Sequence, residues 1–422
     1  MYNYLKNIYG VSDEIINLLK EAEKDTAPYM QRAEEIAQYN TFKVLNSFRK
    51  HNISEMHLGT TTGYGYDDVG RDTLDKVYAD AFGAEDAIVR HNIVNGTMAL
   101  ASCLYGILRP GDKLLAVTGK PYDTLEEVIG VRGEGNGSLK DFGVDYAEVD
   151  LKDGKPDLQA IKNAIDDKVK MVAIQRSRGY AWRDSLSVEE IGEIVKTVKS
   201  VREDIVCFVD NCYGEFTDKK EPTEYGVDIM AGSLIKNPGG GLARSGGYVA
   251  GKAKYVELVS YRLTCPGIGR ECGASLGQNR IMYQGFFMAP HVVCQSIKAG
   301  ILCSYIFEKM GYEVTPSYKD ARNDIITSVM LKSPEKMKAF AKGVQSGSPI
   351  DSFVTPEAWA MPGYESDVIM AAGTFVSGAS IEVSADGPIR EPYTIYYQGG
   401  LTYDSAKLPI ALAADLVKKA EE

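Results

Sequence analysis

The spacing of apolar residues divides the chain into three stretches. Between residues 12 and 50 apolar positions recur at helical spacing, which predicts two N-terminal helices, the second from about Tyr29 to His51. Short β-forming runs then alternate with amphipathic helices, as in a mostly parallel sheet covered by helices. A long helix expected over Ala289 to Gly311 leads into shorter strands and helices, and a helix at Leu408 to Lys419 closes the chain.

The alternating stretch predicts an α/β sheet whose connecting loops gather above the carboxyl ends of its strands. We expect an N-terminal helical segment over residues 1–58, a large domain over 59–300 and a smaller C-terminal α/β domain over 301–422, with the long helix bridging the two domains. The expected strands are 85–90, 113–117, 146–150, 169–175 and 205–210, and helices are expected at 72–82, from 98, from 122, at 158–165 and at 187–201.

Two charged residues stand at the ends of apolar runs in the middle of the chain. Asp210 closes a run of strand formers, and Lys236 ends the run Gly232-Ser-Leu-Ile-Lys before a series of glycines. They are 26 positions apart, about one strand-to-strand excursion, so both side chains can reach one crevice beyond the strand ends. Desolvation in such a crevice is expected to lower the pKa of Lys236 towards nucleophilic use.

Pyridoxal phosphate needs a lysine and a carboxylate of this kind. The lysine holds its aldehyde as a Schiff base, and the carboxylate keeps its ring nitrogen protonated so that the ring can accept electrons from a carbanion. The alternative is that Asp210 caps a turn and that Lys236 lies on a glycine-rich surface loop. The two residues alone leave both interpretations open.

A second motif, Asn95-Gly96-Thr97, lies between a predicted strand and an apolar helix. Free backbone N–H groups, a hydroxyl and the positive end of the helix dipole make such a place suitable for a phosphate. An ordinary helix N-cap is the alternative. Tyr122 stands at a similar strand-to-helix corner, and an arginine-rich loop with Arg176 and Arg178 leaves the strand 169–175.

Composition and motif spacing exclude several other classes of protein. The net charge of −11 argues against a nucleic-acid groove or an anionic membrane surface. The N-terminus lacks the pattern of a signal peptide, and no later run is expected to reach membrane-spanning length. Seven cysteines without a CxxC pair and four scattered histidines predict neither disulfides nor a metal site, so we expect a reduced cytoplasmic protein.

Two glycine-rich segments approach nucleotide-binding motifs without matching them. The segment from His57 to Arg71 contains GxG but lacks the third glycine and a preceding strand, which excludes a nicotinamide fingerprint. The segment from Gly246 to Ala253 has alanine where a phosphate-binding loop needs serine or threonine for magnesium.

Four motifs together resemble a known family: Asp210-Asn-Cys-Tyr-Gly-Glu-Phe, Gly232-Ser-Leu-Ile-Lys-Asn-Pro-Gly-Gly-Gly, Val94-Asn-Gly-Thr and the Gly-Tyr-Gly-Tyr-Asp segment. Over nearly its full length the chain resembles fold-type-I pyridoxal-phosphate enzymes of the cysteine and methionine metabolism group. It is most similar to the methionine gamma-lyase-like or cystathionine beta-lyase-like branch linked to aluminium resistance. The resemblance implies an aspartate-aminotransferase-like fold, with a mostly parallel seven-stranded sheet between helices and a smaller C-terminal α/β domain.

The resemblance also implies roles for single residues. Lys236 would be the Schiff-base lysine and proton shuttle, Asp210 would pair with the ring nitrogen, and Tyr122 would stack on the ring. Tyr66 resembles a tyrosine that reaches across a dimer interface to the neighbour's phosphate; the usual arginine two positions later is Asp68 here, and Arg71 is the expected substitute. The residues expected to hold the cofactor are Asn95, Gly96, Thr97, Tyr122, Asp210, Tyr213, Ser233, Lys236 and Tyr66.

The expected reaction is a carbon–sulfur elimination at the β or γ position of a sulfur-containing amino acid such as cystathionine, cysteine or methionine. Arg390 is the candidate for the substrate carboxylate, with Arg178 and Arg176 as further candidates; a salt bridge of Arg390 with Glu391 or Glu382 is the alternative. The resemblance implies a homodimer or homotetramer with shared active sites. Another enzyme on the same cofactor, such as an aminotransferase, a decarboxylase or a γ-replacing synthase, and a non-catalytic protein with this fold remain alternatives.

Overall fold

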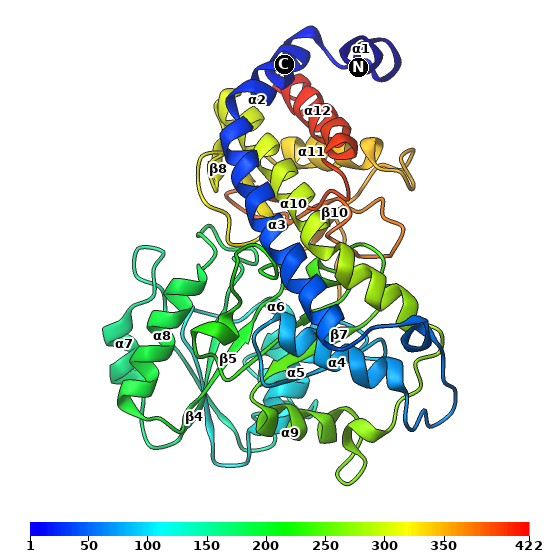
Figure 1. Cartoon of the computed structure of the whole chain (residues 1–422). Helices are drawn as coiled ribbons and strands as arrows, with labels where there is room; N and C mark the ends of the chain where they lie inside the picture. Colours follow the sequence, from blue (N-terminus) through cyan, green and yellow to red (C-terminus); the bar gives the residue numbers. More distant parts are fainter. Residues whose placement is uncertain (422) are drawn as a thin grey trace.

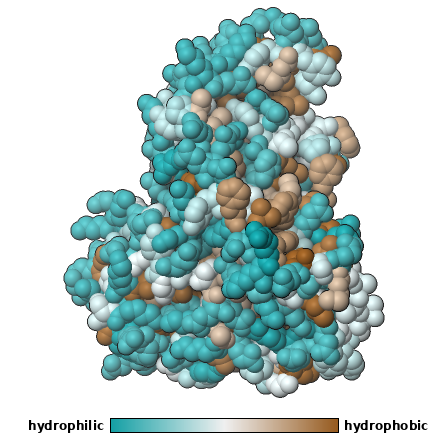
Figure 2. Space-filling model, viewed as in Figure 1, coloured by the Kyte–Doolittle hydropathy of each residue, from teal (hydrophilic) through white to brown (hydrophobic). Residues whose placement is uncertain are grey.

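The computed structural model describes residues 1–421 and contains two sheets, one in the lower and one in the upper half of Figure 1. Two long helices, α3 (Ala27–Lys50) and α10 (Asn279–Lys309), run between the halves. The face seen in Figure 2 is largely hydrophilic, with smaller apolar patches where the two halves meet. The chain is therefore organised as two sheet-based units connected by long helices.

The larger sheet has seven strands in the order β1-β7-β6-β5-β4-β2-β3. Strand β7 runs antiparallel to both of its neighbours, and the other pairs are parallel, so the expected mostly parallel seven-stranded sheet is confirmed. The strands are β1 (Asp86–Arg90), β2 (Lys113–Ala116), β3 (Asp145–Glu148), β4 (Val169–Gln175), β5 (Val206–Asp210), β6 (Ile229–Ser233) and β7 (Gly247–Gly251).

Helices cover this sheet, and all residues of β5 and β6 are buried, which explains why these strands read as continuous apolar runs. Side-chain caps mark several helix starts, such as Ser187, which forms a capping box with Glu190. The helices of this half are α4 (Val69–Ala81), α5 (Gly96–Ile107), α6 (Asp123–Ile129), α7 (Leu158–Ala164), α8 (Val188–Val201) and α9 (Ala253–Leu263), with short 3-10 turns η1 (Glu55–Leu58), η2 (Pro222–Tyr225), η3 (Asn237–Gly239) and η4 (Gly269–Glu271).

The smaller sheet is antiparallel throughout, in the order β10-β11-β12-β9-β8. Helices α11 and α12 pack against each other beside it, and α2 joins them in one apolar core. The elements of this half are β8 (Glu313–Thr315), β9 (Ile326–Met330), β10 (Val368–Ala371), β11 (Ser384–Pro388), β12 (Thr394–Gln398), α11 (Pro334–Gly347), α12 (Tyr403–Lys419) and, from the N-terminus, α1 (Tyr2–Tyr9) and α2 (Asp13–Asp25).

Helix α10 starts earlier than its sequence pattern predicts. The expected start at Ala289 put Pro290 in the first turn, where proline is tolerated; the helix instead runs through Pro290 from Asn279. Apolar residues before the proline, including Phe286, are buried in the core of the larger sheet, and this packing outweighs the break. Residues from Leu302 to Phe307 belong to the core of the smaller sheet. The helix thus spans both cores.

The same helix corrects one expectation, since by length and composition it could cross a membrane. However, 72% of its most apolar window is buried inside the structure, as in the core helix of a globular protein. The domain boundaries at 58 and 300 stay predictions. N-terminal residues enter both cores, with Ile15 in the core of the smaller sheet and Val44 in that of the larger.

Candidate active site

A cavity of about 210 Å³ lies where the two halves of the molecule meet, at the carboxyl ends of β5 and β6. Because adjacent parallel strands end at the same edge of a sheet, residues just beyond them share one crevice. The large-sheet half contributes Asn95, Gly96, Thr97, Leu100, Tyr122, Thr124, Asp210, Cys212, Tyr213, Ser233, Ile235 and Lys236, and the small-sheet half contributes Tyr364, Met370, Ala372, Gly378, Ser380, Ser384 and Asp386.

Lys236 and Asp210 line this cavity together, as their positions at strand ends predict. Asp210 is the last residue of β5 and is buried, and its Oδ1 accepts a hydrogen bond from the Cys212 N–H at 3.0 Å. Half-buried Lys236 follows β6, and its Nζ lies 3.9 Å from the centre of the Tyr213 ring. This cation–π contact places the amine over an aromatic face inside the cavity.

The backbone around Lys236 is fixed by a neighbouring amide. Tyr213 adopts a positive φ of 72°, which is unusual for a residue other than glycine. The Asn237 Nδ2 donates to the carbonyls of Tyr213 and Glu215, both at 2.9 Å, and so holds this conformation. Strained backbone of this kind is often found where a site must be held in one geometry.

The electrostatics of the pair differ from the sequence-based expectation. Burial by itself lowers the pKa of Lys236, but the acidic groups of Cys212, Tyr213 and Asp210 around it raise that pKa above its ordinary value. The predicted lowering is therefore not found in this cavity, because the acidic groups around the amine favour its charged form more than burial disfavours it. Burial raises the pKa of Asp210, and the Lys236 charge opposes this shift.

The N-terminus of α5 forms the other end of the large-sheet wall. Asn95 is the N-cap, and its Oδ1 accepts from the Met98 N–H at 2.8 Å, so the ordinary capping role is present. Thr97 Oγ1 lies 2.9 Å from Thr124 Oγ1. A Cβ on Gly96 would come within 3.3 Å of the Ser233 Cβ, so this glycine keeps space open beside the helix terminus.

Tyrosines from both halves meet at the cavity. The hydroxyls of Tyr122 and Tyr364 lie 2.8 Å apart, and the Tyr180 ring packs 5.9 Å from each of these two rings. Tyr122 precedes α6, whereas Tyr364 belongs to the segment before β10. The contact therefore joins the large-sheet and small-sheet walls.

None of the three predicted substrate arginines lines the cavity. Arg176 is completely buried and donates to Asn211 Oδ1 at 2.9 Å and to Thr217 Oγ1 at 3.1 Å. Arg178 is also buried and donates to the Thr315 carbonyl at 2.8 Å, which joins the two halves.

Arg390 is exposed on the segment after β11. Within residues 1–421 neither of the alternative ion pairs, with Glu391 or with Glu382, is formed. The Glu382 carboxylate instead accepts from the N–H groups of Phe375 and Val376 at 2.7 and 2.9 Å.

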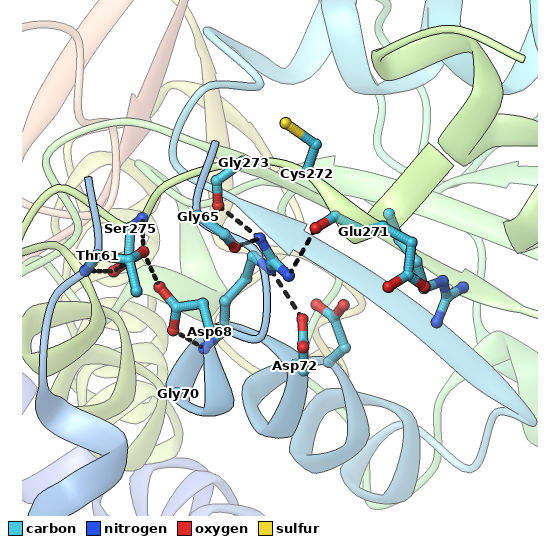
Figure 3. Close-up of polar contacts among 12 residues, drawn as sticks. Thr61, Gly65, Asp68, Gly70, Asp72, Glu271, Cys272, Gly273 and Ser275 are labelled. Carbon is cyan, nitrogen blue, oxygen red and sulfur yellow. Dashed lines mark hydrogen bonds and ion pairs between the residues drawn. The ribbon is translucent and has the colours of Figure 1, made fainter. Parts of the chain in front are cut away.

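Tyr66 lies outside the cavity lining, on a loop that polar contacts hold in place. Its ring stacks on that of Tyr64 at 5.5 Å, and both rings are exposed. Arg71 is buried beneath this loop, and its Nη1 donates to the carbonyls of Gly65 and Gly273, each at 2.7 Å. Figure 3 shows these carbonyls turned towards one centre. Arg71 therefore supports the loop of its own chain.

The model of one protein family, described as methionine gamma-lyase, matches residues 15–418. The chain belongs to the methionine gamma-lyase family. The uncharacterized protein YnbB of Bacillus subtilis (strain 168) is 56% identical over 397 residues, which cover 94% of each chain.

Two solved structures extend this likeness to the fold. The one from Clostridium acetobutylicum, provisionally named a cystathionine beta-lyase involved in aluminum resistance, matches with a TM-score of 0.96 and 50% identity over 98% of both chains. A carbon-sulfur lyase involved in aluminum resistance from Clostridium novyi NT matches with a TM-score of 0.94 and 51% identity over 98% of both chains. The pyridoxal-5'-phosphate-dependent protein YhfS from Escherichia coli, at 18% identity, a TM-score of 0.59 and coverage of 90% of this chain and 95% of that one, shares the fold alone.

Membership of the methionine gamma-lyase family implies pyridoxal phosphate as the cofactor, and the cavity fits this group. Ser233 Oγ is buried and has no hydrogen-bond partner within residues 1–421, although it lines the cavity beside the α5 N-terminus. An unpaired buried hydroxyl is costly unless a ligand pairs with it. Together with Lys236 and Asp210, this supplies groups for the phosphate, the aldehyde and the ring nitrogen. In the described part of the chain, no three His, Cys, Asp or Glu side chains group as metal ligands would.

Several residues that line the cavity were not predicted from the sequence, above all Asp386 and Tyr364. Asp386 is buried on β11 and lies in the same segment as Arg390, which was chosen instead. Strand alternation places Ser384 and Asp386 on one face, and this was the available signal. Tyr364 comes from an irregular segment, so periodicity carried no information about it.

Proposed function

We propose that this protein is a pyridoxal-phosphate-dependent carbon–sulfur lyase that cleaves a sulfur-containing amino acid by β- or γ-elimination. The observation that carries the proposal is one cavity that contains a lysine, a buried aspartate and an unpaired serine hydroxyl beside a helix N-terminus. Family membership and the name of the Clostridium novyi NT structure support the reaction class.

Bound pyridoxal phosphate would supply an electron sink for the carbanion that forms at the substrate Cα. Asp210 would hold a proton on the ring nitrogen, because a buried carboxylate favours a positive charge beside it. Ser233 Oγ and the first N–H groups of α5 bind the phosphate. Gly96 leaves the space that this binding needs.

Lys236 is the group that holds the cofactor and then moves the proton. In its neutral form, Nζ would remove the proton from the substrate Cα and later return a proton to the product side. The raised pKa of the ammonium makes Nζ a strong base once its own proton has been lost. The Tyr213 ring at 3.9 Å stabilises Nζ in its protonated form, so this contact favours the amine after it has taken up the proton. Tyr122 and Tyr364, joined by their hydroxyls, close the cavity between the two halves and limit access of water.

We also propose that the active protein is a cytoplasmic homodimer or homotetramer with shared active sites, in which Tyr66 reaches the neighbouring copy's phosphate. Support comes from the exposure of Tyr64 and Tyr66 on a loop that Arg71 holds firmly. All seven cysteines are free, as is usual in a reducing compartment.

The test is to incubate the protein loaded with pyridoxal phosphate with L-cystathionine, L-cysteine and L-methionine. Elimination releases a thiol or sulfide, an oxo-acid and ammonia in equal amounts, and the identity of the oxo-acid separates β- from γ-elimination. The Lys236→Ala variant is expected to lose this turnover while its unfolding is unchanged. Oxo-acid formation without release of sulfur or ammonia would replace the proposal with an aminotransferase.

A further inference from the structure

The two walls of the cavity carry different charges. The large-sheet wall contains the residues that hold the cofactor. Among the described residues that line the small-sheet wall, Asp386 is the single charged side chain, and no arginine, lysine or histidine accompanies it. A substrate that extends from the cofactor towards this wall therefore meets one acidic and no basic side chain of this chain.

Asp386 is built into this wall. It is 8% exposed on β11, and its Oδ2 accepts from Gln398 Nε2 at 3.0 Å. Burial raises the pKa of Asp386 to about 7, against the effects of the Tyr180 hydroxyl, Lys236 and Gln398. The charge of Asp386 helps to raise the pKa of five nearby phenols: Tyr122, Tyr180, Tyr213, Tyr364 and Tyr396.

A second polar group on the same strand lacks a partner. Ser384 Oγ is buried, lines the cavity and makes no hydrogen bond within residues 1–421. Strand residues two apart point to the same face, so Ser384 and Asp386 offer neighbouring oxygen acceptors. A carboxylate and a hydroxyl together can accept from an ammonium group, which has several donors and no acceptor.

Arg390 is exposed outside the cavity lining, where its charge acts on Asp123 and Tyr396. The other cations near the cavity are engaged elsewhere. Lys236 belongs to the cofactor in the proposed function, and Arg176 and Arg178 donate to residues outside the cavity. An anionic substrate end at the small-sheet wall would face the ionised form of Asp386 without compensation, and a neutral end would leave that charge without a partner. A cationic end would form a charge-assisted hydrogen bond in a desolvated site.

We propose that Asp386 is a specificity residue that selects amino-acid thioethers whose far end carries an ammonium group. This inference rests on the proposed function and names its substrate class. Discrimination arises both from the bond to the ammonium and from the penalty that a buried acid imposes on an anionic end.

The experiment compares three thioethers of similar size: S-(2-aminoethyl)-L-cysteine, S-propyl-L-cysteine and S-carboxymethyl-L-cysteine, or the homocysteine series if the protein performs γ-elimination. We expect kcat/KM to fall in the order cation, neutral, anion, with roughly a 10- to 100-fold step between the first two. Asp386→Asn keeps the shape of the side chain and is expected to bring the cation and neutral substrates within about threefold of each other. Asp367→Asn, an exposed aspartate before β10, is the control and should preserve the order.

A binding readout separates failure of the inference from failure of the proposed function. Calorimetry with the Lys236→Ala protein should give the same order of affinities without turnover, and adding Asp386→Asn should remove it. If the wild type releases thiol from all three compounds at equal kcat/KM, or prefers the anion, the role of Asp386 is wrong and the lyase function stands. If no thiol is released and the cofactor is not retained, the lyase function fails. If the Lys236→Ala protein also binds the three thioethers with equal affinity in calorimetry, the inference about Asp386 fails as well.

Discussion

Replacing Arg71 by methionine tests how the loop that carries Tyr64 and Tyr66 is held. The Arg71 guanidinium is buried and joins two segments through the carbonyls of Gly65 and Gly273. Methionine keeps most of the apolar volume and removes every donor. We expect this loop to open more often, while the sheets keep their packing.

The size of the effect follows from the contacts. The two bonds from Nη1 are each 2.7 Å long and come from a charged donor, and a bond of this kind contributes about 1.5 kcal/mol or more. Their loss therefore favours opening by about 3 kcal/mol, which is roughly a 100-fold change in the opening equilibrium. Two further bonds change this estimate little. The bond from Nη2 to the Glu271 carbonyl is long at 3.4 Å, and the bond from Nε to Asp72 Oδ1 at 2.8 Å lies within α4 and does not hold the loop.

Amide hydrogen exchange measures this opening directly. The N–H of Gly273 donates to the Tyr64 carbonyl at 2.8 Å, and the N–H of Leu276 donates to the Thr61 carbonyl at 3.2 Å, so both report on the loop. Their exchange should accelerate about 100-fold in Arg71→Met. The control is Arg280→Met, which breaks an exposed ion pair with Glu55. Equal exchange in both variants would refute the role given to Arg71.

Two further predictions concern buried groups beside the cavity. Ser233→Ala should leave the thermal stability of the cofactor-free protein unchanged or slightly higher, since the hydroxyl has no partner there, but should weaken cofactor retention. The control is Ser304→Ala, which loses a bond to the Pro316 carbonyl and should lower the thermal stability of the cofactor-free and cofactor-loaded proteins equally. Burial raises the pKa of Glu215 from 4.5 to about 8, so between these pH values the folded protein keeps a proton that the unfolded chain releases. The free energy of unfolding of the wild type therefore falls as the pH rises from 4.5 to about 8. In denaturant titrations, the free energy of unfolding of Glu215→Gln should rise relative to that of the wild type by up to about 1.4 kcal/mol per pH unit over this range. If the difference between the two free energies does not change with pH, Glu215 is ionised in the folded protein.

The larger sheet and its strand-end residues could be predicted because they depend on local patterns. Apolar runs marked β4 and β5, and parallel strands bring their carboxyl ends to one edge, where Asp210 was expected. Lys236 was placed beside it because it ends an apolar run about one strand-to-strand excursion later. The short motif at the start of α5 was recognisable for the same reason. These features need only the order of elements along the chain.

The remaining site residues depend on long-range packing that periodicity does not encode. Arg176 leaves β4 at the expected edge, but its guanidinium turns to Asn211 and Thr217, within 3.7 Å of the buried carboxylate of Glu221. Asp386 reaches the cavity because the antiparallel sheet docks against the parallel one. The pKa of Lys236 likewise depends on the acidic groups that the fold brings around it.

The most direct test of the central claim is borohydride reduction of the protein loaded with pyridoxal phosphate, followed by peptide mapping. Reduction fixes the cofactor to the amine that holds it. The account predicts that the label is found on the peptide containing Lys236 and that Lys236→Ala shows none on that peptide. A label on another lysine, or no label on a protein that is fully active, would contradict it.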